Sequence, residues 1–255
     1  MKQLLLYVNP KKEFDEETAK LAKSQIENSL GLGWKPEDIL FFTNFPYSFM
    51  GIESTIVPDE CYNNLHPQTT KIDTMVYLFD NGFIQDDLYW LHDFDAVQQE
   101  WITEEELELD GIDIGFTDYG RNDRYNGGSV FVRKEAVDIY RELKDQVYEQ
   151  NKGNTGKVLN EEDVLMYLMK IDFNGMKQRI KRLSIGYNFG IKQMKLCYEK
   201  ANGMIKVLHF HPERKYPGWG RAFDIVSTEN NELEKPIMTE RLISLFEKYG
   251  ITRTR

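Results

Sequence analysis

Strand-like and helix-like segments alternate through the first half of this 255-residue chain. Residues 4–8 form a short apolar run typical of a buried strand. Residues 15–30 follow, with Ala19, Ala22, Ile26 and Leu30 at helical spacing and a glycine-rich stop in GLGW. This alternation predicts an α/β fold with a mostly parallel central sheet flanked by helices. In such sheets, binding sites form at the carboxyl ends of strands.

The remaining elements follow from the same patterns. Strands are expected at residues 39–42, 88–91, 112–117, 129–132 and 207–210. Helices are expected at residues 69–83, 134–150 and 237–249, and from Glu161 onward, where Asn160 is the expected N-cap. Residues 44–58 show neither period, so we expect an irregular connection there.

The composition suits one domain over residues 1–255, because 41% of the residues are hydrophobic and the chain is long enough to bury a large core. No apolar run is long enough to cross a bilayer. The apolar start at residues 4–8 is too short for a secretion signal. Cys61 and Cys197 form no metal or redox motif, so a reducing, cytoplasmic location is expected.

The charge distribution has one local exception. A formal net charge of −10 argues against a non-specific nucleic-acid binder, which needs a basic face. Residues 176–195, however, contain basic side chains and no acid: Lys177, Arg179, Lys181, Arg182, Lys192 and Lys195. This segment is either a solvated face or a patch for an anionic substrate or acceptor.

Two carboxylates, Asp93 and Asp95, follow the apolar strand expected at residues 88–91. Residues two apart on an extended backbone share one side of it, so both carboxylates can converge on one Mg²⁺ or Mn²⁺. An ordinary acidic turn would have the same sequence. The neighbouring motifs must therefore decide between the two.

A phosphatase of the haloacid dehalogenase type is one context for this motif, with Asp93 as the nucleophile. Those enzymes carry Asp-x-Asp-x-(Thr/Val) after an apolar strand, which residues 93–97 match. That motif normally ends the first strand of the fold, whereas two strands and two helices precede it here. No convincing later lysine and acidic pair completes the set.

Other segments favour a second context. They are Tyr7-Val8-Asn9 after the first strand, Tyr125-Asn126-Gly127-Gly128 before a later strand, Asn160-Glu161-Glu162-Asp163 at a helix start, and LHFHPERKYPGWG at residues 208–220. In this order, together with Asp93-Phe94-Asp95, they resemble GT-A fold glycosyltransferases from Leu4 to about Arg221. The nearest group is glycosyltransferase family 8, which contains glycogenin and galactosyltransferases.

The resemblance implies an enzyme that moves a hexosyl or pentosyl group from a nucleoside-diphosphate sugar to a hydroxyl acceptor. It implies Mn²⁺ or Mg²⁺ held by Asp93, Asp95 and His209, with His211 as a competing ligand. The other implied roles are base and ribose contacts by Tyr7, Val8 and Asn9, diphosphate contacts by Lys71 and Lys215, and sugar contacts by Asn126, Gly127 and Glu162. Residues about 1–120 would form the nucleotide-binding half, and about 121–255 the acceptor half.

Stereochemistry and acceptor stay open. Glu162 stands where the family usually has Gln, and Tyr216 and Gly218 interrupt its Lys-Pro-Trp motif. An inverting enzyme would use Asp163 or Glu162 as the general base, whereas the departing phosphate could serve in a retaining one. The acceptor is a glycan, a lipid-linked or another hydroxyl compound; a nucleic-acid acceptor stays possible but has no support in the sequence. A sugar- or nucleotide-binding protein without turnover is a third alternative.

Overall fold

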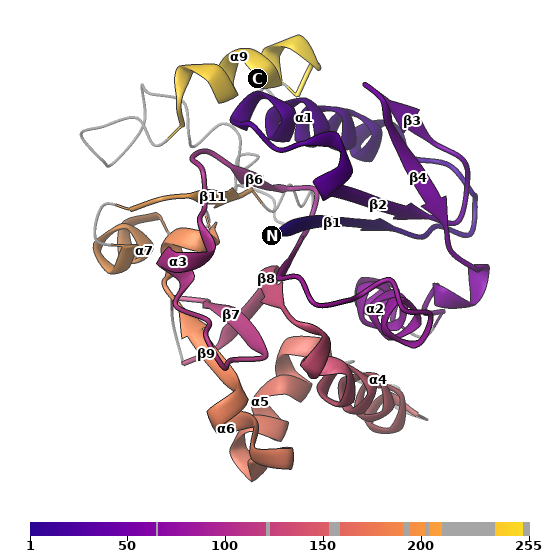
Figure 1. The fold of residues 1–255 in the computed structure, drawn as a ribbon, viewed down its shortest axis with the longest axis vertical. Helices are drawn as coiled ribbons and strands as arrows, with labels where there is room; N and C mark the ends of the chain where they lie inside the picture. The colour runs from indigo at the N-terminus through magenta and orange to yellow at the C-terminus, as the bar shows by residue number, and fades with distance from the viewer. Residues whose placement is uncertain are drawn as a thin grey trace, which may run out of the picture.

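The computed structural model describes residues 1–64, 66–120, 123–152, 159–190, 194–201, 204–210 and 238–251. Its largest sheet has eight strands in the order β3-β4-β2-β1-β5-β8-β7-β9, and a smaller sheet has the order β10-β11-β6 (Figure 1). The strands are β1 (Lys2–Tyr7), β2 (Ile39–Thr43), β3 (Ser48–Phe49), β4 (Ile52–Ile56), β5 (Tyr89–His92), β6 (Ala96–Gln98), β7 (Ile114–Asp118), β8 (Tyr125–Val132), β9 (Ile180–Leu183), β10 (Phe189–Gly190) and β11 (Val207–His209). The helices are α1 (Glu16–Leu32), α2 (Thr70–Asp80), α3 (Glu104–Leu107), α4 (Val137–Asn151), α5 (Glu161–Ile171), α6 (Met176–Arg179), α7 (Met194–Ala201) and α9 (Glu240–Lys248).

The large sheet is mixed. Strands β4, β2, β1 and β5 run parallel to one another, and β9 runs parallel to β7. Strand β8 runs antiparallel to both β5 and β7, and β3 runs antiparallel to β4. The predicted α/β class with a mostly parallel sheet is therefore confirmed, with antiparallel pairing at β8 and at the edge strand β3.

Helices cover both faces of this sheet (Figure 1). Successive side chains of a strand point to opposite faces, so each strand contributes side chains to the hydrophobic core on each face of the sheet. Leu4 and Leu91 pack in the cluster that includes side chains of α2, α4 and α5, whereas Leu5 and Trp90 pack in the cluster that includes Ile26 of α1. A third cluster joins β11 to α9. The continuous apolar runs of these strands thus reflect burial on two faces.

The prediction of an irregular connection at residues 44–58 is wrong. Strand β4 lies within it, pairs in parallel with β2 and extends the sheet toward its edge. Most of β4 is not buried, and its middle residues Glu53, Ser54 and Thr55 are polar, so the hydrophobic pattern of a central strand is missing. The other predicted strands and helices are found with shifted ends, although Ile237 lies outside the described residues.

Three of the six basic side chains at residues 176–195 form ion pairs within the described part of the chain: Arg179, Lys181 and Arg182. Arg179 donates to Asp113 at 2.6 Å and to Asp138 at 2.7 Å, and its hydrogen bonds lower the pKa of Asp138 to about 2. Lys181 pairs with Glu108 at 2.9 Å. Nearby Tyr187 and Phe189 are buried, so they do not face an acceptor. Among the described residues, this segment therefore gives little support to an anion-binding patch.

No helix within the described ranges is long and apolar enough to cross a membrane.

Candidate functional site

The two carboxylates of the Asp-x-Asp motif lie in the loop that joins β5 to β6. Strand β5 is buried throughout and ends at His92, directly before Asp93. The side chains of Asp93 and Asp95 are 38% and 20% exposed. The motif therefore stands where a core strand reaches the surface at its carboxyl end, as the sequence predicts.

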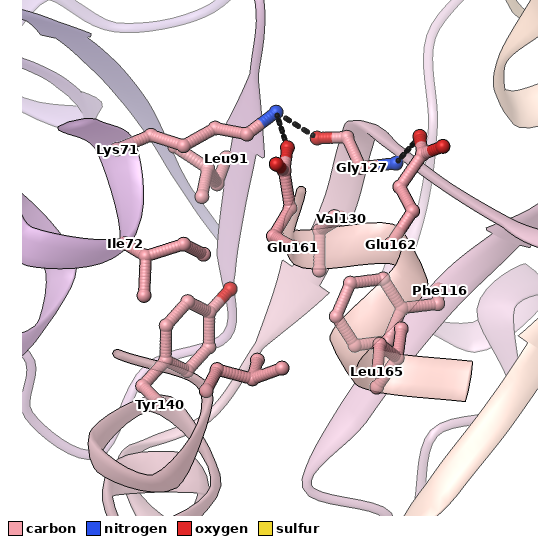
Figure 2. Close-up of a pocket in the computed structure, with 11 residues that line it drawn as sticks. Lys71, Ile72, Leu91, Phe116, Gly127, Val130, Tyr140, Glu161, Glu162 and Leu165 are labelled. Atoms are coloured by element: carbon pink, nitrogen blue, oxygen red, sulfur yellow. Dashed lines mark hydrogen bonds and ion pairs between the residues drawn. The ribbon is translucent and has the colours of Figure 1, made fainter. Parts of the chain in front are cut away.

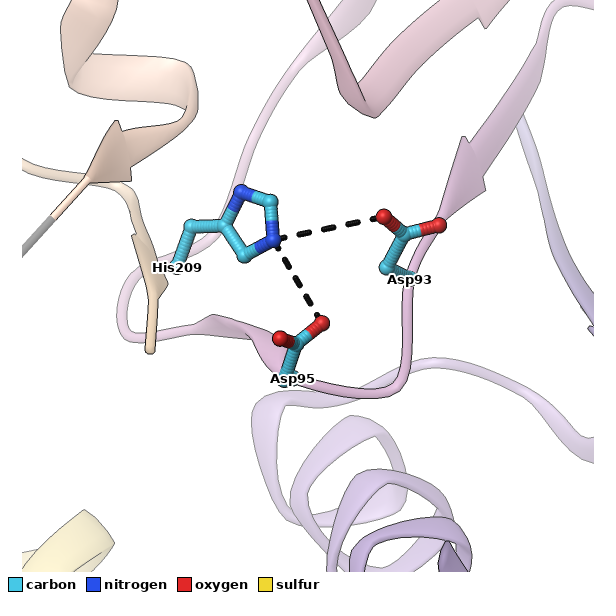
Figure 3. Close-up of side chains that lie close together, drawn as sticks. All are labelled: Asp93, Asp95 and His209. Carbon is cyan, nitrogen blue, oxygen red and sulfur yellow. Dashed lines mark ion pairs between the residues drawn. The ribbon is translucent and has the colours of Figure 1, made fainter. Parts of the chain in front are cut away.

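Strand β11 brings His209 to this loop. It pairs antiparallel with β6, with His209 opposite Ala96, and the Phe210 amide donates to the Asp95 carbonyl at 2.9 Å. The imidazole is 3% exposed, and its Nε2 lies 3.4 Å from Asp95 Oδ1 and 4.0 Å from Asp93 Oδ2 (Figure 3). Three side chains from two distant parts of the sequence thus converge at one point.

This arrangement fits a divalent cation. One ligand atom from each of Asp93, Asp95 and His209 lies within 4.8 Å of the others. In an octahedral site with bonds of about 2.1 Å, adjacent ligand atoms lie about 3 Å apart and opposite ones about 4 Å. Small side-chain movements would therefore give all three bonding distances. Two carboxylates also supply the negative charge that offsets a divalent ion.

A bulge in β8 forms one wall of the site. Phe116 of β7 pairs with Val130, but the next residue, Thr117, pairs with Asn126, so residues 127–129 have no partners in this register. The Gly128 carbonyl accepts from the Asp93 amide at 2.9 Å. This bond fixes the start of the loop at residues 93–95, called the metal loop below. The segment predicted to enter a strand is therefore inside β8, and its distortion turns backbone groups toward the site.

Gly128 also makes room for the imidazole. A Cβ atom at this position would lie 2.2 Å from His209 Cε1 and 2.6 Å from His209 Nδ1. Such distances are shorter than van der Waals contact, so any side chain at Gly128 would displace the ring. The second glycine of the Asn-Gly-Gly segment is thus required by close packing.

A buried lysine organises the charges beside the metal group. Lys71 Nζ lies 3.1 Å from Glu161 Oε1 and donates to the Gly127 carbonyl at 2.9 Å (Figure 2). It also lies 3.3 Å from Asp93 Oδ1. Burial alone would lower the pKa of Lys71, but Asp93 and Glu161 together raise it above its ordinary value. The lysine is therefore cationic and offsets part of the local negative charge.

The start of α5 supplies two further acids. Asn160 caps the helix by accepting from the Asp163 amide at 3.0 Å, as the sequence predicts. Glu162 Oε1 accepts from the Gly127 amide at 3.1 Å, and Asp163 Oδ1 accepts from Arg124 Nη2 at 2.8 Å. Burial raises the pKa of Glu162. The hydrogen bond from the Gly127 amide lowers it and the charge of Glu161 raises it, so that the pKa stays above its ordinary value. Arg124 thus contacts both acids, at 2.8 Å from Asp163 and 3.7 Å from Glu162.

The segment after β1 lies against the metal loop. The centroid of the Tyr7 ring lies 4.6 Å from that of the Phe14 ring and 6.1 Å from that of the Phe94 ring. Phe94 is the residue between the two aspartates in the sequence. Asn9 donates its amide to Asn44 Oδ1 at 2.9 Å, and Val8 is buried. Their contacts with a base and ribose stay a prediction.

His92 was missed as a site residue by the sequence analysis. It is 3% exposed, its Nε2 lies 2.6 Å from Gln3 Nε2, and its Nδ1 lies 3.1 Å from the Asp93 carbonyl. Since the Gln3 amide nitrogen can only donate, His92 carries its proton on Nδ1 and donates to Asp93. Burial lowers the pKa of His92 to about 4, so the ring is neutral and supports the loop. Arg124 was also missed, and Glu161 was recognised only as part of the helix-start segment, since their partners come from distant segments.

The cavity below the charged groups is too small for a sugar. It has a volume of about 10 Å³, room for about one water molecule. Its apolar walls include Ile72, Phe116 and Leu165, with Lys71 and Glu161 at its polar end (Figure 2). The side chains of Lys71, Glu161 and Glu162 thus rest on a packed floor. Lys215 and His211 lie outside the described residues.

Comparisons with known proteins give matches only among solved structures. No family model matches the sequence, and no curated protein matches it. A glycosyltransferase involved in glycosylation of the major capsid of PBCV-1 matches with 14% identity and a TM-score of 0.51, over 84% of this chain and 94% of that one. Mouse xyloside xylosyltransferase 1 matches with 13% identity and a TM-score of 0.52, over 85% of this chain and 99% of that one.

A third match decides the fold. The galactosyltransferase LgtC, solved in complex with donor and acceptor sugar analogs, matches with 14% identity and a TM-score of 0.57, over 100% of this chain and 97% of that one. The chain has the GT-A glycosyltransferase fold. The resemblance found in the sequence is confirmed for the fold, and in this GT-A fold Asp93, Asp95 and His209 form the candidate metal group.

The Gly128 packing gives a direct test of the metal group. We expect Gly128→Ala to weaken binding of Mn²⁺ about 10–100-fold, because the added methyl group displaces the His209 ring. Isothermal titration calorimetry with MnCl₂ measures this. Gly115→Ala is the matched control, since its Cβ would also clash, at 2.7 Å from Leu183 Cδ1, with a side chain that is not part of the metal group. Unchanged affinity in Gly128→Ala would show that His209 is not a ligand.

Proposed function

We propose that this protein is a metal-dependent glycosyltransferase that moves a sugar from a nucleoside-diphosphate sugar to a hydroxyl acceptor. The convergence of Asp93, Asp95 and His209 carries the proposal. In a GT-A fold, such a group at the carboxyl end of a core strand is suited to hold a cation beside a diphosphate.

Three side chains would hold the cation, and one would assist them. Mn²⁺, or Mg²⁺, bound by Asp93, Asp95 and His209 would supply positive charge beside the donor's diphosphate. Lys71 lies 3.3 Å from Asp93 Oδ1, so its ammonium group would add charge at the same place. Lys215, which the resemblance assigns to the diphosphate, would be a second such cation.

The transfer itself needs a proton acceptor. The acceptor hydroxyl oxygen forms a bond to the anomeric carbon while the bond from that carbon to the diphosphate oxygen breaks, and the diphosphate leaves with the electron pair. We assign Glu162 to take the hydroxyl proton, because burial raises its pKa and so makes its carboxylate more basic. Asp163 is held by Arg124 at 2.8 Å and would orient the site.

The remaining residues would shape the donor site. Asn126 and Gly127, in the β8 bulge, would contact the sugar, and Tyr7, Val8 and Asn9 would contact the base and ribose. Residues about 1–120 would then bind the nucleotide, and residues about 121–255 the acceptor. The acceptor class is a glycan, a lipid-linked or another hydroxyl compound.

The alternatives receive less support. The matching structures reported above are all glycosyltransferases, so the fold does not support a haloacid dehalogenase-type phosphatase with Asp93 as nucleophile. A binding protein without turnover would share the fold and the metal group. Release of free nucleoside diphosphate during incubation with donor and acceptor distinguishes the enzyme from such a protein.

Ligand-induced stabilisation tests the proposal directly. We expect Mn²⁺ with a matching nucleoside diphosphate, at about 100 times its Kd, to raise the melting temperature by about 5–10 °C. Asp95→Asn should abolish this shift, because it removes a charged ligand. Differential scanning fluorimetry with uridine, guanosine and adenosine diphosphates measures it, and Asp110→Asn, at an exposed site, is the control. The proposal fails if no diphosphate gives a Mn²⁺-dependent shift in the wild type.

The assignment of the base has its own test. Because the pKa of Glu162 is raised above its ordinary 4.5, kcat should fall as the pH is lowered through the raised value and Glu162 becomes protonated. We expect Glu162→Gln to lower kcat about 100-fold and to remove this acid limb. Steady-state rates of diphosphate release between about pH 4.5 and pH 8 measure both effects, because this range runs upward from the ordinary pKa of a glutamate. An acid limb that persists in Glu162→Gln but disappears in Asp163→Asn would make Asp163 the base.

A further inference from the structure

The backbone carbonyls of residues 93–95 and of Ala96, the first residue of β6, each accept a hydrogen bond. The Asp93 carbonyl accepts from the Ala96 amide at 3.0 Å, and the Asp95 carbonyl accepts from the Phe210 amide at 2.9 Å. The two remaining carbonyls, of Phe94 and Ala96, accept from the side chain of one residue, Gln25. The loop is therefore fixed by its own backbone, by β11 and by α1.

Gln25 reaches the loop from the buried face of α1. It is 0% exposed, and its Nε2 donates to the Phe94 carbonyl at 3.0 Å and to the Ala96 carbonyl at 2.7 Å. Both contacts require the amino group of the side chain, so the orientation of this amide is determined. These two carbonyls lie on either side of Asp95, one of the three candidate ligands.

The other end of the same amide shows what the side chain supplies. Gln25 Oε1 is buried and accepts no hydrogen bond within the described part of the chain. A buried acceptor without a partner opposes folding, whereas an apolar side chain of similar size would not. The two donated bonds to the loop are thus the distinctive contribution of glutamine at this position.

We propose that Gln25 is a positioning residue for the metal site: by holding the peptide groups on both sides of Asp95, it keeps that carboxylate aimed at His209 and Asp93. The inference rests on the proposed function, since it takes these three residues as metal ligands. Without the two bonds, the Asp95 carboxylate would sample orientations that do not meet the cation. Metal binding would then have to order this side chain, and the free energy needed for that would raise the Kd for the metal.

A neighbouring residue provides a matched control. Asn28 lies one turn further along α1, is also 0% exposed, and donates from its side-chain amide to the Gln98 carbonyl at 2.7 Å. Gln98 lies beyond the loop, at the end of β6. Replacing Asn28 therefore removes this buried bond between α1 and β6, together with the bond that Asn28 Oδ1 accepts from Arg241 of α9, without touching the peptides around Asp95.

The experiment compares Gln25→Met with Asn28→Leu in the full chain. Isothermal titration calorimetry with MnCl₂ gives the Kd for the metal, and differential scanning fluorimetry gives the melting temperature. We expect Gln25→Met to raise the Kd for Mn²⁺ about 10–100-fold. Asn28→Leu should lower the melting temperature at least as much as Gln25→Met does. It should leave the Kd for Mn²⁺ within about threefold of wild type, because it does not touch the residues around Asp95.

Three results are decisive. If wild-type protein binds no Mn²⁺, the proposed function fails. If wild-type protein binds Mn²⁺ and Gln25→Met binds it equally well, the positioning role alone is overturned. Equal weakening in Gln25→Met and Asn28→Leu also overturns it, because Gln25 would then act only through stability. Should Gln25→Met not fold, Gln25→Asn, which keeps the amide but is one methylene too short, is judged by the same Kd criterion.

Discussion

The antiparallel pairing of β6 with β11 is the interaction on which the candidate site depends. It sets His209 opposite Ala96 and ties the Phe210 amide to the Asp95 carbonyl. One register therefore places an imidazole from late in the chain beside two carboxylates that follow a core strand. A shift by one residue would turn His209 to the other face of its strand. The buried residues of β11 that pack against β6 and α9 hold that register.

Electrostatics then give the site its chemical character. Carboxylates of Asp93, Glu161 and Glu162 gather around the ammonium group of Lys71, whose side chain is 16% exposed, and Asp95 lies beside Asp93 in the metal group. Like charges at such distances destabilise one another unless they are paired. The β8 bulge offsets part of this repulsion through the Gly127 amide and carbonyl. A divalent cation would relieve more of it, so the fold and the charge distribution favour the same ligand.

Local patterns in the sequence predicted much of this arrangement. The apolar strand before Asp93 and the cap at Asn160 are short-range signals, and the structure bears out both. The polar edge strand β4 and the support by Gln25 and His92 were not predictable in this way. Their environment is set by residues far along the chain, and a buried glutamine looks like any exposed one in a helical pattern. Gly128 carries a turn-like signal, yet its reason is the His209 ring packed against it.

The central claim is that one divalent cation binds where these three side chains meet. The most direct measurement is anomalous diffraction from a crystal grown with Mn²⁺ and a nucleoside diphosphate. Our account predicts a single strong manganese peak within bonding distance of Asp93, Asp95 and His209, with the diphosphate on its open side. A manganese peak elsewhere, or one bound by the carboxylates with His209 turned away, would contradict it.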